Sequence, residues 1–413
     1  MYLQLFRNTR FLRIWAAQIC SGLAANLLNF ALVIRVYDLA QGSRYANVAV
    51  SLLIVSFALP SVIFAVVAGA YVDRWDRKKV LLWSNLIRAV LVLLFLVFEK
   101  NLFAVYGLVF LISIFTQFFI PAEAAALPRL VRKDQLLTTN SLFLFSFYAS
   151  FVIGYSLAGP AVGLFGPQST YIIMSGAFGL AALLVLGLPQ LKPEEGTAHG
   201  RTVSSVLSQV RESLGEILRT KTLFFPLLNL TISQAVIGVI AVLAPALATI
   251  LFHQSLTAAS VKLIVPAAVA MVIGAILVGQ WGKKANKVKL INYGIVLGAA
   301  SLFALGMVHR VDDWPMFIAI VIAISAVMGF ANALVTVSAQ TLLQLNTSDQ
   351  QRGKVFGALN MLINIAALVP VVLAGISADI ISPTAVLVGA AALLAAFGVV
   401  QRVTFGKIAL KNA

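Results

Sequence analysis

Charged residues are scarce in this sequence. Only 11% of its 413 residues are Asp, Glu, Lys or Arg, whereas a soluble domain carries about 25%. Apolar residues make up 61%. They form segments of roughly 18–28 residues along the whole chain, and about 20 helical residues span the hydrocarbon core of a bilayer. The composition excludes an ordinary soluble domain and predicts a polytopic helical membrane protein.

Cysteine, histidine and nucleotide-binding loops are also rare or missing. The single cysteine, Cys20, excludes an intrachain disulfide. The three histidines lie far apart in the sequence and form no cluster with metal-ligand spacing. No glycine-rich loop ends in Gly-Lys-Ser or Gly-Lys-Thr, which argues against ATP as the energy source. We therefore expect no metal, no cofactor and no enzymatic activity.

The apolar segments predict an all-α membrane protein with twelve spans in two six-helix repeats. Six spans precede residues 190–221 and six follow. We expect an N-terminal bundle at 1–189, a linker with an amphipathic helix at 190–221, and a C-terminal bundle at 222–413. The predicted spans are 11–37, 46–71, 80–98, 102–126, 138–163, 168–189, 222–250, 259–281, 288–308, 315–343, 354–379 and 384–404.

Basic residues gather on one side of the predicted spans. Most of the 30 lysines and arginines fall in the termini, in the linker, and in the loops after spans 2, 4, 8 and 10. Loops rich in Lys and Arg face the cytoplasm, so we predict a multi-pass protein of the plasma (inner) membrane with both termini cytoplasmic. The net charge of +16 then reflects topology and attraction to an anionic lipid surface, and we expect no nucleic-acid partner.

Two stretches of the first half are repeated in the second. "GAYVDRWDRKKV" from Gly69 aligns with "GQWGKKANKVKL" from Gly279, and "LVRKDQ" from Leu130 aligns with "LNTSDQ" from Leu345. The pairs occupy equivalent loops, after spans 2 and 8 and after spans 4 and 10. Two six-helix repeats are typical of a transporter that exposes its site alternately to the two sides of the membrane.

The loop after span 2 resembles the signature loop of the major facilitator superfamily. The family usually has glycine where this chain has Asp76, so we expect a less tight turn here. The matching pattern is Gly69-x-x-x-Asp73-Arg74-x-x-Arg77-Lys78.

Two further stretches resemble the branch of that superfamily that holds macrolide-efflux proteins and the enterobactin exporter. They are "FIPAEAAALPRLVRKDQLLTTNSL" at 119–142 and "QRGKVFGALNML" at 351–362. In span 5, "GYSLAGPAVG" is similar to the antiporter signature of drug exporters, through Gly154, Gly159, Pro160 and Gly163. An ordinary packed helix with a proline bend is the alternative interpretation.

The signature loop suggests a cytoplasmic gate. Gly69 would let neighbouring helices approach closely, and an acid at a span end accepts hydrogen bonds from the N-terminus of a helix in the other half. The bases that follow can pair with nearby acids. The alternative is that these charges only obey the positive-inside bias. The expected gate residues are Gly69, Asp73, Arg74, Arg77, Lys78, Arg88 and Glu123.

Glu123 is the one acid that we place inside a predicted span, where a charge is costly and marks a functional candidate. Two roles stay open: an ion pair with Arg77 or Arg88 in the gate, or the carrier of a transported proton. Span 1 lacks the acid that drug antiporters of the family often have, which counts against ordinary proton coupling.

Neutral polar residues recur inside the predicted spans. They either line a central cavity or hydrogen-bond between helices. The candidates are Asn26, Asn29, Gln117, Asn229, Gln234, Asn332, Asn360 and Asn364.

Together these features and the resemblance predict a secondary active transporter. The first hypothesis is a multidrug efflux antiporter that exports amphipathic, macrolide-like molecules by alternating access, with protons as the coupling ion. An exporter or permease for one defined metabolite, such as a siderophore or lysolipid, is the alternative with the same fold. A non-transporting membrane sensor is a third hypothesis. We expect a monomer whose partners are a small-molecule substrate, protons and the lipid bilayer.

Overall fold

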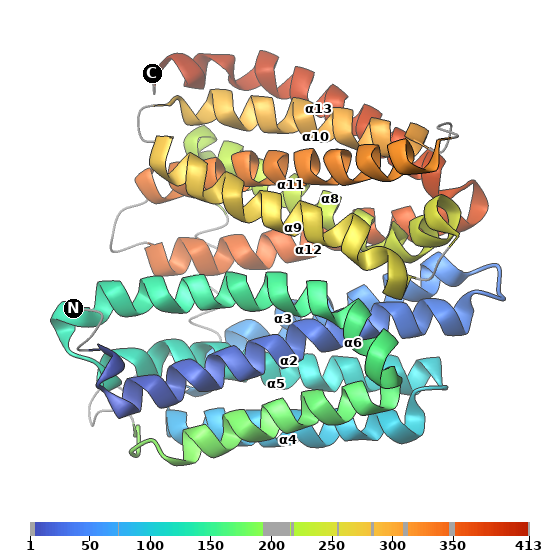
Figure 1. The fold of residues 1–413 in the computed structure, drawn as a ribbon. Helices are drawn as coiled ribbons and strands as arrows, with labels where there is room; N and C mark the ends of the chain where they lie inside the picture. The colour runs from blue at the N-terminus through green and yellow to red at the C-terminus, as the bar shows by residue number, and fades with distance from the viewer. Residues whose placement is uncertain are drawn as a thin grey trace. The chain divides into compact units, whose positions relative to one another are not determined.

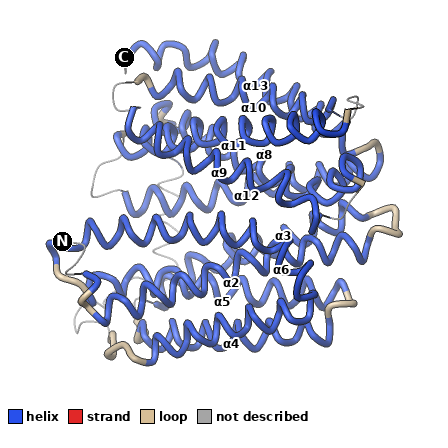
Figure 2. The backbone as a smooth tube through the Cα atoms, viewed as in Figure 1, coloured by secondary structure: helices blue, strands red, loops and turns tan. Residues whose placement is uncertain are grey.

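The structure is a computed structural model that describes residues 5–72, 74–192, 215, 219–253, 256–281, 285–308, 313–346 and 352–411. Within these ranges the chain consists of helices joined by loops, without a strand (Figures 1 and 2). The elements are α2 (Thr9–Ala40), α3 (Ala46–Val72), α4 (Arg77–Phe98), α5 (Leu102–Leu130), η1 (Lys133–Gln135), α6 (Leu136–Leu186), α8 (Lys221–Phe252), α9 (Leu256–Trp281), α10 (Lys287–Met307), α11 (Trp314–Leu345), α12 (Arg352–Ile380) and α13 (Pro383–Lys411).

Helix α6 is two spans in one continuous run. It has 51 residues, but Gly166 inside it has φ 76° and ψ 163°, a conformation that only glycine adopts readily. Pro167 follows, a residue that suits the start of a new helix. Among the described residues, 11 helices are long and apolar enough to cross a membrane when α6 is counted once. Dividing α6 at Gly166 confirms the predicted twelve spans and the all-α fold.

The chain forms two compact units. Unit 1 comprises Met1–Leu39 and Val55–Ser208, and unit 2 comprises Ala40–Ile54 and Gln209–Ala413. Helix α3 is therefore divided: its first turns belong to unit 2 and the remainder to unit 1. The bundle boundaries at 189 and 222 stay a prediction, and the amphipathic stripe expected in the linker lies outside the described residues.

Helix ends repeat between the two halves, as the aligned loops predicted. Asp76 caps the N-terminus of α4 with φ −66° and ψ 112°, and Asn286, at the aligned position, caps α10 with φ −67° and ψ 113°. Asn101 and Asp313 likewise accept a hydrogen bond from the N–H three residues on, at the starts of α5 and α11. A short polar side chain, Asp in one repeat and Asn in the other, satisfies orphan N–H groups at each of these helix starts.

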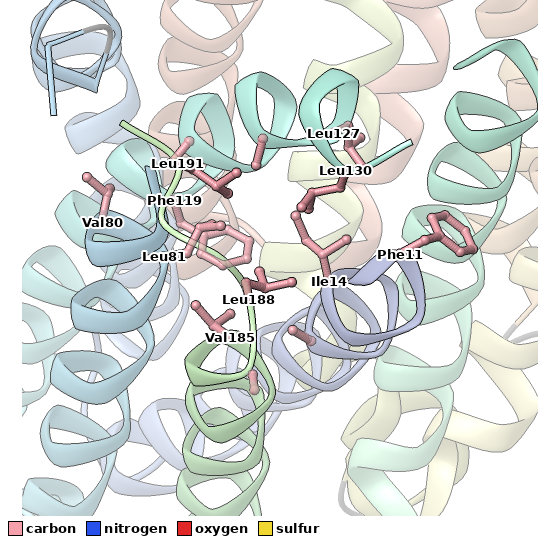
Figure 3. Packing of buried hydrophobic residues seen from close by; sticks show 14 of the residues in the cluster. Phe11, Ile14, Val80, Leu81, Phe119, Leu127, Leu130, Val185, Leu188 and Leu191 are labelled. Atoms are coloured by element: carbon pink, nitrogen blue, oxygen red, sulfur yellow. The ribbon is translucent and has the colours of Figure 1, made fainter. Parts of the chain in front are cut away.

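Each unit is held by its own helix contacts. In unit 1, α4 packs on α5 and on α6, and an apolar cluster joins α2, α4, α5 and α6 at one end (Figure 3). In unit 2, α11 packs between α9 and α10, while α8 packs on α12. At Gly329 of α11 only glycine fits, because a Cβ there would lie 1.9 Å from the Ala267 carbonyl oxygen of α9.

Candidate functional site

Asp76, the residue that departs from the family pattern, fastens the loop after α3 to two elements. Its Oδ1 accepts hydrogen bonds from the backbone N–H of Lys78, at 3.0 Å, and from that of Leu191, at 3.0 Å. The first bond caps α4, and the second holds the chain just after α6. A glycine at this position could make neither side-chain bond, so the substitution adds a tie within unit 1.

Three arginines bind the carbonyl groups of residues 187–192, the segment that leaves α6. Arg13 of α2 donates to the Gly187 carbonyl, and Arg129 of α5 donates to that of Lys192. Arg77, the first residue of α4, donates to the Leu191 carbonyl through both its backbone N–H, at 3.3 Å, and its guanidinium, at 3.4 Å. Cations at a helix C-terminus satisfy its last carbonyls and suit its dipole. The loop, α2 and α5 are thereby joined to the exit of α6.

Leu191 anchors this segment through its apolar side chain. It is buried, and its side chain packs beside Phe119, Leu81 and Leu188 in the apolar cluster of unit 1 (Figure 3). Arg77 is also buried. The predicted gate residue Arg77 therefore serves a structural connection within unit 1.

Other residues of the predicted gate differ in their surroundings. A Cβ built on Gly69 meets no atom within 4 Å, so the close helix approach expected at this glycine is not found among the described residues. The side chain of Arg74 is exposed, and that of Lys78 is half-buried. Asp73 lies outside the described residues.

Arg88 is fully buried inside unit 1, although it carries a charge. Its guanidinium lies between two aromatic rings, 4.6 Å from the centre of Phe119 of α5 and 4.7 Å from that of Phe178 of α6. Its Nε donates to the Ser84 carbonyl and its Nη2 to the Asn85 side chain. Cation–π contacts and hydrogen bonds to its own helix together stabilise the buried cation.

Glu123 of α5 is half-buried and interacts electrostatically with Arg88. Its Oε1 is buried without a hydrogen-bond partner, and no ion pair joins the two side chains in the part of the chain that the structure describes. The expected direct ion pair of Glu123 with Arg88 is thus not formed in this structure; the described N–H bonds of the guanidinium go to Ser84 and Asn85. Glu123 remains a carboxyl group with an unfilled bonding site.

One glycine of the antiporter-like motif, Gly154, lies where α6 comes close to α2. A Cβ on Gly154 would lie 2.6 Å from the Cβ of Asn26, so this glycine permits the approach of a predicted cavity residue. Next to it, the ring of Tyr155 packs on Phe30 and Phe151, and its hydroxyl interacts with Asn29. In the same motif Gly159 is buried, Pro160 is half-buried and lies inside the helix, and Gly163 is exposed.

Three of the eight predicted cavity residues bond to their own helix. Asn26, Gln117 and Asn229 each donate to the carbonyl four residues earlier. Asn332 is different, because its amide donates to the Ser233 hydroxyl at 2.7 Å and so joins α11 to α8. Gln234 is exposed and Asn364 is half-buried, while the side chain of Asn360 lies outside the described ones.

Sequence reasoning missed two sets of contacts. Arg13 and Arg129 carry no local signal for their role, since their partners are backbone carbonyls far along the chain. Arg35 of α2 and Glu99 at the end of α4 form a partly buried ion pair of 3.1 Å, which no sequence motif indicated. By contrast, Asp76 stands directly before a helix start, which is a recognisable capping position.

Twelve apolar helices with repeated halves are an arrangement typical of membrane transporters. The family model described as Major Facilitator Superfamily matches residues 14–369 and again 238–407. The first match covers most of the sequence. The chain therefore belongs to the major facilitator superfamily, and it is a transporter, not an enzyme.

Known proteins match nearly the whole chain at low identity. Macrolide efflux protein A of Streptococcus pyogenes is 24% identical over 376 residues, which are 90% of this chain and 89% of that protein. Enterobactin exporter EntS of Citrobacter koseri is 26% identical over 354 residues, which are 84% of this chain and 80% of that protein. The crystal structure of nucleoside transporter NupG has a TM-score of 0.76 over 95% of this chain and 99% of that one, at 12% identity. This last likeness shows the shared fold.

We predict that Asp76→Ala lowers the unfolding free energy by about 1–2 kcal/mol, because it removes an N-cap and the bond to Leu191. Asp134→Ala is the matched control. Asp134 forms an ion pair with Arg132 in which both side chains are more than half exposed, and such pairs contribute little. Thermal unfolding of the purified proteins in detergent measures both. Equal decreases in unfolding temperature for the two variants would contradict the stabilising role assigned to Asp76.

Proposed function

We propose that this chain is a secondary active exporter of amphipathic small molecules, working by alternating access. The observation that carries the proposal is the likeness, along most of both chains, to a macrolide efflux protein and to an enterobactin exporter. Both are named as exporters of large organic molecules. The aromatic side chains of Phe30, Phe151 and Tyr155 pack together next to the side chains of Asn26 and Asn29, which combines apolar groups with a few polar ones. Sites of that composition suit amphipathic ligands.

We propose an orientation with both termini in the cytoplasm of a bacterial inner membrane. The bias of Lys and Arg supports it. The end of unit 1 that holds Asp76, Arg77 and Arg129 is then cytoplasmic, and the ion pair of Arg35 with Glu99 lies toward the outside. In this orientation the loop after α3 acts as the inner gate, with Asp73 as its acid.

A defined metabolite is the alternative substrate, since enterobactin is itself a siderophore. A broad substrate range and a single substrate predict different outcomes of one transport assay, so the assay decides between them.

The transport assay uses purified protein in proteoliposomes with a membrane potential and a pH gradient imposed, and a panel containing macrolides, a catecholate siderophore and lysolipids. We expect several amphipathic compounds to be transported. Asp73→Asn should abolish transport while the protein still folds and inserts, because the gate loses its charge and keeps its shape. Asp134→Asn, an exposed acid near the same surface, should transport at the unaltered rate.

Transport by Asp73→Asn at the unaltered rate would refute the gate. Transport of one compound alone would establish the metabolite alternative, and flux of none of them would refute export of these molecules.

We also propose that Glu123 couples transport to protons. It lies within α5 and its Oε1 lacks a donor, so uptake of a proton would remove a charge that the membrane interior stabilises poorly. Glu123→Gln should stop accumulation driven by a pH gradient alone, while substrate binding changes by only a few-fold. Glu99→Gln, which removes another buried acid, should lower stability and keep the coupling. Accumulation by Glu123→Gln vesicles under a pH gradient alone would leave Glu123 as a gate residue only.

A further inference from the structure

Asp379 caps the N-terminus of a helix other than its own. Its Oδ1 accepts one hydrogen bond from the backbone N–H of Asn47, at 3.1 Å, and another from the side-chain amide of Asn47, at 2.7 Å. Its Oδ2 accepts from the N–H of Val48, at 2.9 Å. Helix α3 begins at Ala46, so both backbone donors belong to the first turn, whose N–H groups have no partner within the helix. The carboxylate therefore satisfies donors that α3 cannot satisfy itself.

The position of Asp379 in its own helix is unfavourable. It stands one residue before the end of α12, where the partial charge of the helix is negative and repels a carboxylate. The N-terminus of α3 carries the opposite partial charge. The contact with α3 is thus what makes an acid at this end of α12 stable.

Helices α3 and α12 also pack closely next to the Asp379 contact. A Cβ on Gly375 of α12 would lie 2.0 Å from the Ser51 hydroxyl of α3, and this hydroxyl donates to the Val371 carbonyl at 3.2 Å. Asn47 of α3 bonds to Asp379 of α12, and Ser51, one turn later in α3, bonds to Val371, which lies earlier in α12. The two helices are antiparallel here.

Helix α3 changes unit within its length. Its bonds to α12 come from Asn47, Val48 and Ser51, which belong to unit 2. Beyond that point it packs on α5 in unit 1: the Ser113 hydroxyl donates to the Phe57 carbonyl at 2.6 Å, and Phe64 packs on Phe110. Pro60 lies in this part, and a proline inside a helix lacks the N–H that would bond four residues back, which makes it a site of bending.

We propose that Asp379 is a gate residue on the side of the membrane opposite Asp73, holding the start of α3 against α12. The inference rests on the proposed alternating access and orientation. In that orientation this contact faces outward, and it must break each time the start of α3 moves with the rest of unit 1. Asp73 directly follows the last residue of α3, and Asp379 stands at the corresponding end of α12. The antiparallel helices α3 and α12 thus each have an acid at the C-terminal end, Asp73 and Asp379. In the proposed orientation Asp73 lies on the cytoplasmic side of the membrane and Asp379 on the outer side.

The test measures access to the contact and needs no substrate. Ser51→Cys, in a Cys20→Ser background, reports on the interface, because Ser51 is buried between α3 and α12. A membrane-impermeant maleimide is added from outside to intact cells. We expect slow labelling with Asp379 in place. With Asp379→Ala we expect labelling about tenfold faster, the factor given by about 1.4 kcal/mol of lost closing free energy. The labelling rate with Asp379→Asn, which keeps one acceptor oxygen, should lie between the rates with Asp379 and with Asp379→Ala.

Asp313→Ala is the matched control, since Asp313 caps only its own helix, by accepting from the Met316 N–H. It should change the labelling rate by less than twofold. Equal rates with and without Asp379→Ala, in protein that elutes as a folded species, would overturn the inference. If Asp379→Ala does not fold, the unaltered rate with Asp379→Asn would overturn it. A failed transport assay with the expected labelling would instead refute the proposed function and leave the contact standing.

Discussion

Every helix that crosses a membrane leaves backbone N–H and C=O groups unsatisfied at its ends, and this constraint organises the structure. Asp76, Asn101, Asn286 and Asp313 cap the starts of their own helices. The carbonyls after α6 are instead bound by arginines of other helices, and the start of α3 is bound by Asp379. Caps within one helix fix local structure. Caps supplied by another helix also fix how helices pack.

Helix α3 is where this distinction matters for transport. Its first turns are bound to α12 through Asp379 and Gly375, and the rest of the helix is bound to α5. Under the proposed alternating access, a helix that has partners in both units cannot keep all of them throughout the cycle. The contact that is made by a few charged hydrogen bonds at one end is the one that a transport cycle can break and remake.

The fold could be predicted almost completely from the sequence, because the length and apolarity of a spanning segment are dictated by the bilayer. The repeat was also visible, and the caps Asp76 and Asn286 lie at aligned positions. Side-chain partners were harder to predict. Arg88 was expected to pair with an acid. It interacts electrostatically with Glu123, but its guanidinium also lies between Phe119 and Phe178, and aromatic rings can stabilise a cation without any charge pattern in the sequence. The contacts of Asp379 could not be predicted, because its partners belong to a helix more than three hundred residues earlier.

The central claim is that α3 exchanges its contact with α12 during transport. Spin labels on Tyr45→Cys and Ile381→Cys, both exposed positions at the two helix ends, report the separation of these ends by pulsed electron paramagnetic resonance. The measurement uses the Cys20→Ser background in proteoliposomes, with and without a transported compound. The account predicts two populations of distances whose proportions change when transport occurs. One narrow distribution that stays the same while the protein transports its substrate would contradict it.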